Sequence, residues 1–453
     1  MSDKSLTVVI SDLHLGGGVA DPGDDHVYHD QQLVRFLNTG LPEAQHGHIE
    51  LFINGDFLEF AQTSPDAYKL HSATYWCSEA ESCEKLATIL NGHQDIFEAL
   101  KAFQARGNRV TIAPGNHDVD LYWLKIQQAI RHVAGPVQFE AGLKACSRYE
   151  GRLVIEHGHL YDPADTFQHW TAPFLTAQDG VRLEMCPGTL FMAKFVNWLE
   201  KYYPFADNMI PITALARLLW REKKTGFAAA AWMLFRFIGL HPLTALSTDE
   251  AAAELPNVGQ AIRMRLQLNQ NFLQGITTLY RDVRTSTASP EAVQQVLDTD
   301  EKVAEFLREL VLGVSPDQWL HLFDGLSATT LSVGDGGTTL SVLQGAMAGD
   351  KEKLRKAAQA HMVHGAEVVV CGHTHQPDEW RPGEHSKGGY FNPGSWTRYV
   401  DVRDMPNLTL DDLQDEADFP YQLNYIRIER LASGALRADK VLVEQQNGGK
   451  FLL

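Results

Sequence analysis

Five clusters of polar residues each follow a short run rich in Val, Ile or Leu, and this recurrence constrains the fold more than any other feature of the sequence. Such runs, bounded by turn residues, predict buried strands. In α/β sheets functional side chains collect at the carboxyl ends of strands, so five clusters can converge on one site. Glycine beside four of them lets the backbone turn sharply where a strand ends. The clusters are Asp12-Leu13-His14, Asn54-Gly55-Asp56, Gly115-Asn116-His117-Asp118, His157-Gly158-His159 and Gly372-His373-Thr374-His375.

The first 160 residues alternate strand-like and helix-like segments, which predicts a layered α/β core. Helix-spaced apolar residues predict helices over 86–103 and 121–133. The expected strands are 6–10, 49–53, 109–113 and 153–156, and further strand-like runs follow at 367–371, 389–391, 422–429 and 436–443.

The pattern changes between about residues 166 and 360, where β-branched runs give way to helix-periodic segments such as 190–199, 212–220 and 303–312. We therefore predict a mostly helical insertion that serves as a lid or an oligomerisation domain. The predicted organisation is a first part of the core at 1–165, the insertion at 166–360 and a second part of the core at 361–453.

Composition narrows the class of protein. A chain of 453 residues with 44% apolar and 21% charged residues is a folded protein, and five irregularly spaced cysteines point to a reducing compartment. The most apolar stretch, 227–240, is shorter than the roughly 20 residues of a membrane-spanning helix. A net charge of -18 disfavours nucleic acid as a partner. We expect a cytoplasmic protein, with peripheral membrane contact as an option.

Together the clusters offer carboxylates, an amide oxygen and several imidazoles but no thiolate, a set that suits Mn, Fe, Zn or Co. Asp56 is placed centrally and could bridge two ions. Each cluster alone also has an ordinary structural interpretation, since Asp-Leu-His can cap a helix and His-x-His can form a surface turn. The five together favour a metal site.

The same clusters form an ordered series of Asp-x-His, Gly-Asp-x-x-Asp/Glu, Gly-Asn-His-Asp/Glu, a lone His and Gly-His-x-His. In this series the sequence resembles the calcineurin-like metallophosphoesterases, over about residues 5–160 and 365–400. The resemblance implies an α/β fold, a four-layer αββα sandwich of two facing sheets flanked by helices, here with the large helical insertion.

The resemblance also implies a dinuclear centre of two divalent ions, Mn, Fe or Zn, with Asp56 as the bridge. One ion would take Asp12, His14, Asp56 and His375, and the other Asp56, Asn116, His157 and His373. A water between the two ions would attack phosphorus. The catalytic residues would be His117, facing the leaving group, and Asp118, orienting the ring of His117.

Other residues near the motifs have less specific interpretations. Glu59, where many relatives have Asp, is expected to affect substrate choice or support the metal ligands, and His159 is either a substrate-facing group or a solvated loop histidine. An acidic solvated loop is the preferred interpretation of Asp24, Asp25, His26 and His29. The turn at 392–395 is expected to shape the floor of the site.

The expected function is metal-dependent hydrolysis of a small or lipid-linked phosphoester or pyrophosphate. The motifs Asp12-Leu-His-Leu and Gly55-Asp-Phe-Leu-Glu are similar to the branch that contains UDP-diacylglucosamine pyrophosphohydrolases, although those enzymes are shorter and commonly carry Arg where this chain has His117. The alternatives are a nuclease or a cyclic or other phosphodiesterase, and then an inactive interaction scaffold, which would have lost metal ligands that this chain keeps.

The insertion has its own charge pattern. Residues 191–240 carry seven basic and three acidic side chains among helix-spaced apolar residues. This segment could be a lid that accepts an acyl chain or rests on an anionic membrane. The other interpretation is packing within the insertion or against a second copy of the chain in a homo-oligomer.

Overall fold

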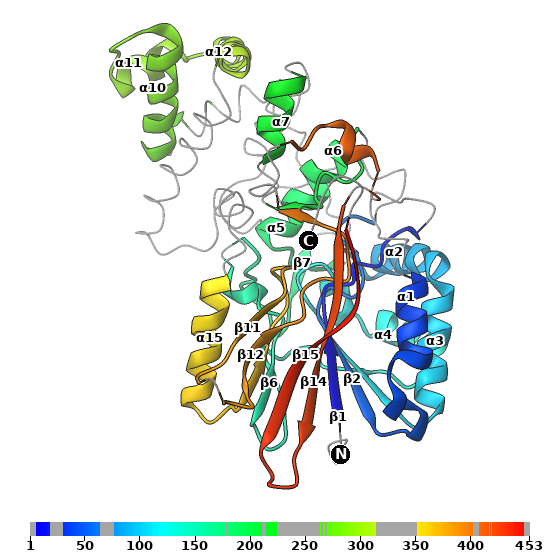
Figure 1. Cartoon of the computed structure of the whole chain (residues 1–453). Coiled ribbons are helices and arrows are strands. Elements are labelled where there is room, and N and C mark those ends of the chain that lie inside the picture. The colour runs from blue at the N-terminus through cyan, green and yellow to red at the C-terminus, as the bar shows by residue number, and fades with distance from the viewer. Residues whose placement is uncertain are drawn as a thin grey trace.

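The computed structural model contains two β-sheets that face each other, flanked by helices (Figure 1). It describes residues 6–18, 30–63, 77–162, 164–177, 180–200, 202–210, 214–223, 263, 266–267, 270–313, 351–383, 385–401, 407–415, 417 and 419–447. One sheet has the order β15-β14-β1-β2-β3-β4 and the other β11-β12-β10-β6-β5. The resulting αββα sandwich confirms the predicted fold class.

The strands agree closely with the apolar runs of the sequence. The first sheet contains β1 Leu6–Ile10, β2 Ile49–Asn54, β3 Arg109–Ala113, β4 Gln138–Phe139, β14 Tyr421–Arg430 and β15 Leu436–Gln446. The second contains β5 Cys146–Arg148, β6 Leu153–Ile155, β10 Val368–Val370, β11 Asp378–Trp380 and β12 Gly389–Asn392. The short strands β4, β5 and β11 were not expected, because two or three residues carry no readable alternation.

Alternate residues of each strand enter different cores. Val9 and Phe52 of the first sheet pack against Ile155 and Val370 of the second, so they form the layer between the sheets. Val8 points the other way, into the core beneath the helices of the N-terminal half. Because both faces of β1 are covered, the strand is apolar apart from Thr7 and does not alternate between apolar and polar residues.

Helices cover the outer face of each sheet (Figure 1). The first sheet is covered by α1 Asp30–Arg35, α2 Glu79–Gly92, α3 Gln94–Ala105 and α4 Leu124–Ala134, and the second by α15 Lys351–Val363. Short helical turns lie at Phe36–Gly40, Pro42–His46, Val119–Tyr122, His159–Tyr161 and Asp411–Gln414.

The single helix expected over 86–103 is two helices. Ser78 begins α2 with a capping box, in which its side chain accepts from the Glu81 amide and Glu81 accepts from the Ser78 amide. The chain leaves helical geometry at His93, which has φ -126° and ψ 34°. Gly92 lies there against the backbone of Gly17, where a Cβ atom would stand 3.0 Å from a carbonyl oxygen.

Parallel pairing brings the polar clusters to one end of the sandwich. Strands β1, β2 and β3 are parallel and in adjacent register, and so are β6, β10 and β12. Within each sheet the carboxyl ends therefore point the same way, and every cluster follows one of these strands. The His373 amide after β10 donates to the Asp12 carboxylate after β1, so the ends of the two sheets lie together.

The insertion contains helices and some strands. Its described elements are β7 Phe174–Ala177, β8 Gly180–Leu183, α5 Pro187–Phe191, a π-helical stretch Met192–Val196, α6 Asn197–Glu200, β9 Met209–Ile210, α7 Ala214–Glu222, α10 Gln270–Arg284, α11 Pro290–Val296 and α12 Asp300–Gly313. The hairpin β7–β8 was not expected from the loss of β-branched runs, and β9 pairs with β13 Val400–Asp401 in the C-terminal part of the chain. Residues of these elements share one hydrophobic core with Val119 and Tyr122 of the N-terminal half and with Leu413 and Phe419 of the C-terminal part.

A buried ion pair ties α2 to the turn that follows the third cluster. Lys85 Nζ lies 2.8 Å from Asp120 Oδ1, and the two side chains are 3% and 2% exposed. Asp120 also accepts a hydrogen bond from Ser82. Removing one partner of such a pair leaves an uncompensated charge in the interior.

We therefore expect Lys85→Met to lower the free energy of unfolding by about 3–5 kcal/mol, measured by urea denaturation. Lys101→Met, on the exposed side of α3, is the matched control and should change it by less than about 0.5 kcal/mol. Equal unfolding free energies for the two variants would contradict the importance of the pair.

Candidate metal centre

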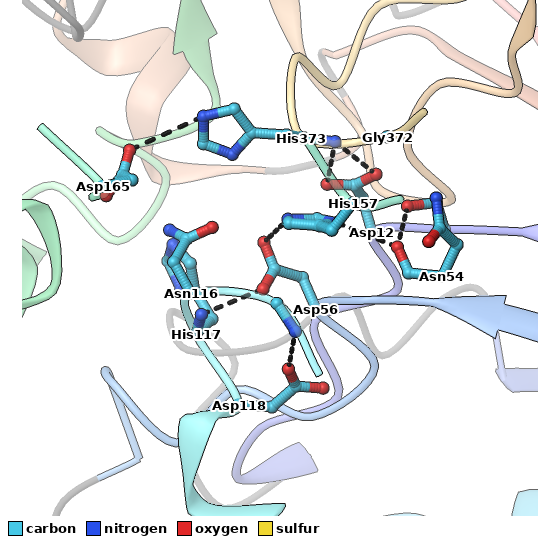
Figure 2. Close-up of polar contacts among 12 residues, drawn as sticks. Asp12, Asn54, Asp56, Asn116, His117, Asp118, His157, Asp165, Gly372 and His373 are labelled. Carbon is cyan, nitrogen blue, oxygen red and sulfur yellow. Dashed lines mark hydrogen bonds and ion pairs between the residues drawn. The ribbon is translucent and has the colours of Figure 1, made fainter. Parts of the chain in front are cut away.

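The polar clusters meet at the carboxyl ends of β1, β2, β3, β6 and β10 (Figure 2). All seven residues predicted to bind metal lie at these strand ends. Six of them fall into groups whose ligand atoms are within 4.8 Å of one another, and Asn116 lies beside these groups. The loop residues Asp24, Asp25, His26 and His29 lie outside the described part of the chain.

Most of the predicted ligands have a left-handed backbone. Of the eight described non-glycine residues with positive φ, five are predicted ligands: Asp12, His14, Asp56, His373 and His375, with φ between 48° and 69°. This conformation costs about 1–3 kcal/mol per residue and concentrates at functional sites. It turns each side chain back across the end of its strand.

Two of the flanking glycines are required for space rather than for a turn. A Cβ atom on Gly115 would lie 2.2 Å from Asp56 Oδ1, and one on Gly372 would lie 2.0 Å from Ser11 Oγ and 2.6 Å from Asp12 Oδ2. Gly55 and Gly158 have positive φ and fit the turn explanation, and a Cβ atom on Gly55 would also lie 2.3 Å from His157 Nδ1.

The first group consists of Asp12, His14 and His375. His14 Nε2 lies 3.1 Å from His375 Nε2, which lies 3.6 Å from Asp12 Oδ1. The other nitrogen of His14, Nδ1, lies 2.7 Å from Glu59 Oε2, so Glu59 orients the ring. Three groups therefore direct donor atoms to one point.

The second group consists of Asp56, His157 and His373. His157 Nδ1 hydrogen-bonds the Asn54 carbonyl at 2.8 Å, which directs Nε2 to Asp56 Oδ2 at 2.9 Å. Asn116 lies beside this group (Figure 2), and its buried Oδ1 has no hydrogen-bond partner among the described residues. A buried oxygen without a partner is costly, and a divalent cation would satisfy it.

Asp56 connects the two groups. Its Oδ2 lies 2.9 Å from His157 Nε2 and 3.9 Å from His14 Nε2. Burial favours the neutral acid, yet His157 and His117 outweigh it and hold the pKa of Asp56 well below its usual value. The residue is therefore a carboxylate placed between two sets of imidazoles, and the donor set fits divalent metal ions.

His117 is oriented by Glu59. The ring Nδ1 lies 2.6 Å from Glu59 Oε2. Burial alone lowers the pKa of His117, but Glu59 and Asp56 outweigh it and raise that pKa to about 10. Burial likewise raises the pKa of Glu59, but His117 and His14 outweigh it and lower that pKa to about 2. The pair therefore holds the imidazole protonated.

The expectation that Asp118 orients His117 is wrong. The Asp118 carboxylate accepts hydrogen bonds from the backbone amides of Phe57, Leu58 and Gly115 and thereby ties two clusters together. Burial, with Asp56 nearby, raises the pKa of Asp118 to about 7. Adjacent residues in a turn point apart, so sequence neighbours were a poor guide to which carboxylate meets the ring.

His159 is not a solvated loop residue. It is 2% exposed, its ring meets Trp170 edge-on at a centroid distance of 4.3 Å, and it also packs against Phe167. Neither ring nitrogen has a hydrogen-bond partner among the described residues. Burial first, and then His157 and His373, lower its pKa well below the usual value, so the ring is neutral.

The turn after the last cluster hydrogen-bonds to the backbone of two predicted ligands, and its role in shaping the floor of the site stays a prediction. Ser395 Oγ and the Trp396 amide both donate to the Asp12 carbonyl, at 3.0 and 3.1 Å, and the Ser395 amide donates to the His375 carbonyl. Two residues that sequence reasoning missed are Asp162 and Asp165, which approach His373 Nε2 to 3.7 and 3.6 Å. The only available signal was their position five and eight residues after His157.

Residues 6–211 match the family model described as calcineurin-like phosphoesterase. The matched range contains four of the five clusters, and the cluster at 372–375 lies beyond it. No curated protein matches the chain. In the described part of the chain, the helices are too short or too polar to cross a membrane.

The crowding at Gly115 yields a test. We expect Gly115→Ala to abolish binding of Mn²⁺, measured by calorimetric titration, because the new Cβ would displace the Asp56 carboxylate and press on the Asp56 amide, 2.7 Å away. Gly383→Ala, with no heavy atom within 4 Å of the added Cβ, is the control and should bind as the wild type does. Normal binding by Gly115→Ala would refute the packing argument.

The left-handed backbone at His375 yields a second test. In metal-free protein, His375→Gly should be more stable than His375→Ala by about 1 kcal/mol, because glycine adopts φ of +56° without penalty. At exposed His132 in α4 the glycine variant should instead be less stable than the alanine variant, since glycine disfavours a helix by about 1 kcal/mol. Urea denaturation measures both, and the same order at both positions would contradict the assigned strain.

Proposed function

Because the chain belongs to the calcineurin-like phosphoesterase superfamily, we propose that this metal-dependent phosphoesterase works through a dinuclear centre. The observation that carries the proposal is the Asp56 carboxylate, which lies within reach of His157 on one side and His14 on the other. One ion would be held by Asp12, His14, Asp56 and His375, and the other by Asp56, Asn116, His157 and His373.

A pair of divalent ions in such a site lowers the pKa of a water to make a nucleophile and neutralises the phosphoryl oxygens. The protein supplies the geometry and the proton. Since Glu59 engages His117 Nδ1, the opposite nitrogen, Nε2, is the one that can donate a proton to the leaving-group oxygen. The low pKa of Glu59 keeps it ionised, and its charge holds that proton on the ring until transfer.

For the substrate, we propose a small or lipid-linked phosphoester or pyrophosphate. The net charge of -18 supports this choice over a nucleic acid, and a phosphodiesterase acting on cyclic or other diesters is the second candidate. The retention of every predicted ligand argues against an inactive scaffold. The identity of the metal, Mn, Fe or Zn, remains a prediction, as does a cytoplasmic location.

The lid and membrane interpretation of the insertion also remains a prediction. In α7 the apolar side chains Leu215, Leu218 and Leu219 are buried in the core of the insertion, which supports internal packing for this helix. Arg221 and Glu222 bond to the backbone of Leu408 and Leu410. Residues 224–240, the most apolar part of the segment, lie outside the described residues.

The substrate class can be tested directly. The Mn²⁺-loaded protein should be assayed in parallel on a phosphomonoester, a phosphodiester, a nucleotide-diphosphate sugar and single-stranded DNA. We expect turnover of one of the first three and none of DNA. Hydrolysis of DNA alone would replace the proposal with a nuclease, and no hydrolysis with any of Mn, Fe or Zn would refute the catalytic assignment.

The roles of Asp56 and His117 separate in a second experiment. Asp56→Ala should lose both ions, measured by mass spectrometry of the native protein, because the carboxylate belongs to both sets of ligands. His117→Ala should keep both ions and lose about 10²–10⁴-fold in kcat on substrates with poor leaving groups, and less on good ones.

The control is His132→Ala, the same substitution on the exposed face of α4, which should behave as the wild type. If His117→Ala lost the ions, or kept its rate on poor leaving groups, the proton-donor role would be wrong.

A further inference from the structure

The far side of the His373 ring faces two carboxylates for which the site described so far has no use. Its Nε2 lies 3.6 Å from Asp165 Oδ2 (Figure 2) and 3.7 Å from Asp162 Oδ2. His373 also belongs to the group with Asp56 and His157. With Nε2 turned to the acids, Nδ1 is the nitrogen available to that group.

The backbone alone does not fix this ring. The His373 amide donates to both oxygens of Asp12 at 3.0 Å, and its φ is 69°, so the main chain is held in place. The imidazole can still rotate about its side-chain bonds. An acceptor on Nε2 would fix both its orientation and its tautomer, as is usual for histidines that bind metal.

The two acids are positioned independently of His373. Asp162 Oδ1 accepts from the Ala164 amide at 2.8 Å, and the Asp165 amide donates to the Asp162 carbonyl at 3.0 Å. Asp165 Oδ1 accepts from the Cys186 thiol at 3.5 Å. The acids therefore have a local framework, made by the chain that leads from His157 into the insertion.

Gly188, in the first turn of α5, closes this framework. Its amide donates to the Ala164 carbonyl at 2.7 Å, and a Cβ atom on it would lie 2.0 Å from Asp165 Oδ1. The start of the insertion is thus packed directly on the carboxylate that approaches His373.

We propose that Asp165, with Asp162 beside it, is a positioning residue that accepts the Nε2 proton of His373 and presents Nδ1 to the metal ion held by Asp56, Asn116 and His157. This inference rests on the proposed function, because it requires His373 to be a metal ligand. The Asp165 charge also increases the basicity of the ring. The insertion, through Gly188, then supports the ion that His373 would bind.

The test is the affinity for each of two Mn²⁺ ions, measured by calorimetric titration and by electron paramagnetic resonance of the bound Mn²⁺. In Asp165→Ala we expect one of the two ions to bind about 10–100-fold more weakly while the other keeps its affinity. Asp165→Asn, which keeps an acceptor but no charge, should fall between Asp165→Ala and the wild type. Circular dichroism and thermal unfolding check that the variants fold.

Gly188→Ala tests the same effect while both acids remain in the sequence. The added methyl would push the Asp165 carboxylate away, and we expect the same ion to weaken, although alanine favours a helix more than glycine does. Gly383→Ala, where the added Cβ has no atom within 4 Å, is the matched control and should bind both ions normally.

The outcomes are distinguishable. If the wild type binds no ions, the proposed function itself fails. If the wild type binds two ions and Asp165→Ala binds both with unchanged affinity, the positioning role is wrong while the proposed function stands. If the wild type binds three ions and Asp165→Ala loses only the third, the two acids and His373 form a separate site, which also overturns the proposal.

Discussion

The backbone at the ends of β1, β2 and β10 is held in a left-handed conformation, and the arrangement of the site depends on it. Asp12, Asp56 and His373 adopt positive φ, a conformation that costs an L-residue about 1–3 kcal/mol of conformational free energy. Each side chain lies among the polar clusters at the strand ends (Figure 2). Hydrogen bonds from one strand end to the next hold this geometry. The amides of Leu13 and His14 both donate to the Asp56 carbonyl, at 2.8 and 2.9 Å.

Holding the strand ends together brings like groups close to each other. His14 and His375 face each other through Nε2 at 3.1 Å, and burial, with His14 nearby, keeps the pKa of His375 well below its usual value. Two imidazoles cannot both be protonated at that distance at low cost. An arrangement in which imidazoles, carboxylates and a buried amide oxygen converge is poorly suited to a metal-free interior and well suited to cations.

The first helices of the insertion contact the loops that carry the site residues. Thr189 donates to the Asn116 carbonyl at 3.0 Å, and Gln62, three residues after Glu59, donates to Glu200 at 2.7 Å. Through Cys186 and Gly188 the same segment packs on Asp165. The first helices of the insertion therefore support the loops that carry Asn116 and Glu59.

Sequence alone determined the longer strands and the helical segments that cover them, and it pointed to the polar clusters, because local apolar periodicity and short motifs report on local structure. It could not determine which polar side chains meet. The choice of Glu59 over Asp118 as the partner of His117, the burial of His159 against Trp170 and the approach of Asp165 to His373 each depend on the directions of side chains from separate loops. The last cluster is separated from the first by more than 350 residues, and only the parallel pairing of β10 with β6 brings His373 beside His157. The distances between side chains on different strand ends follow from the packing of the two sheets. No local sequence pattern encodes that packing.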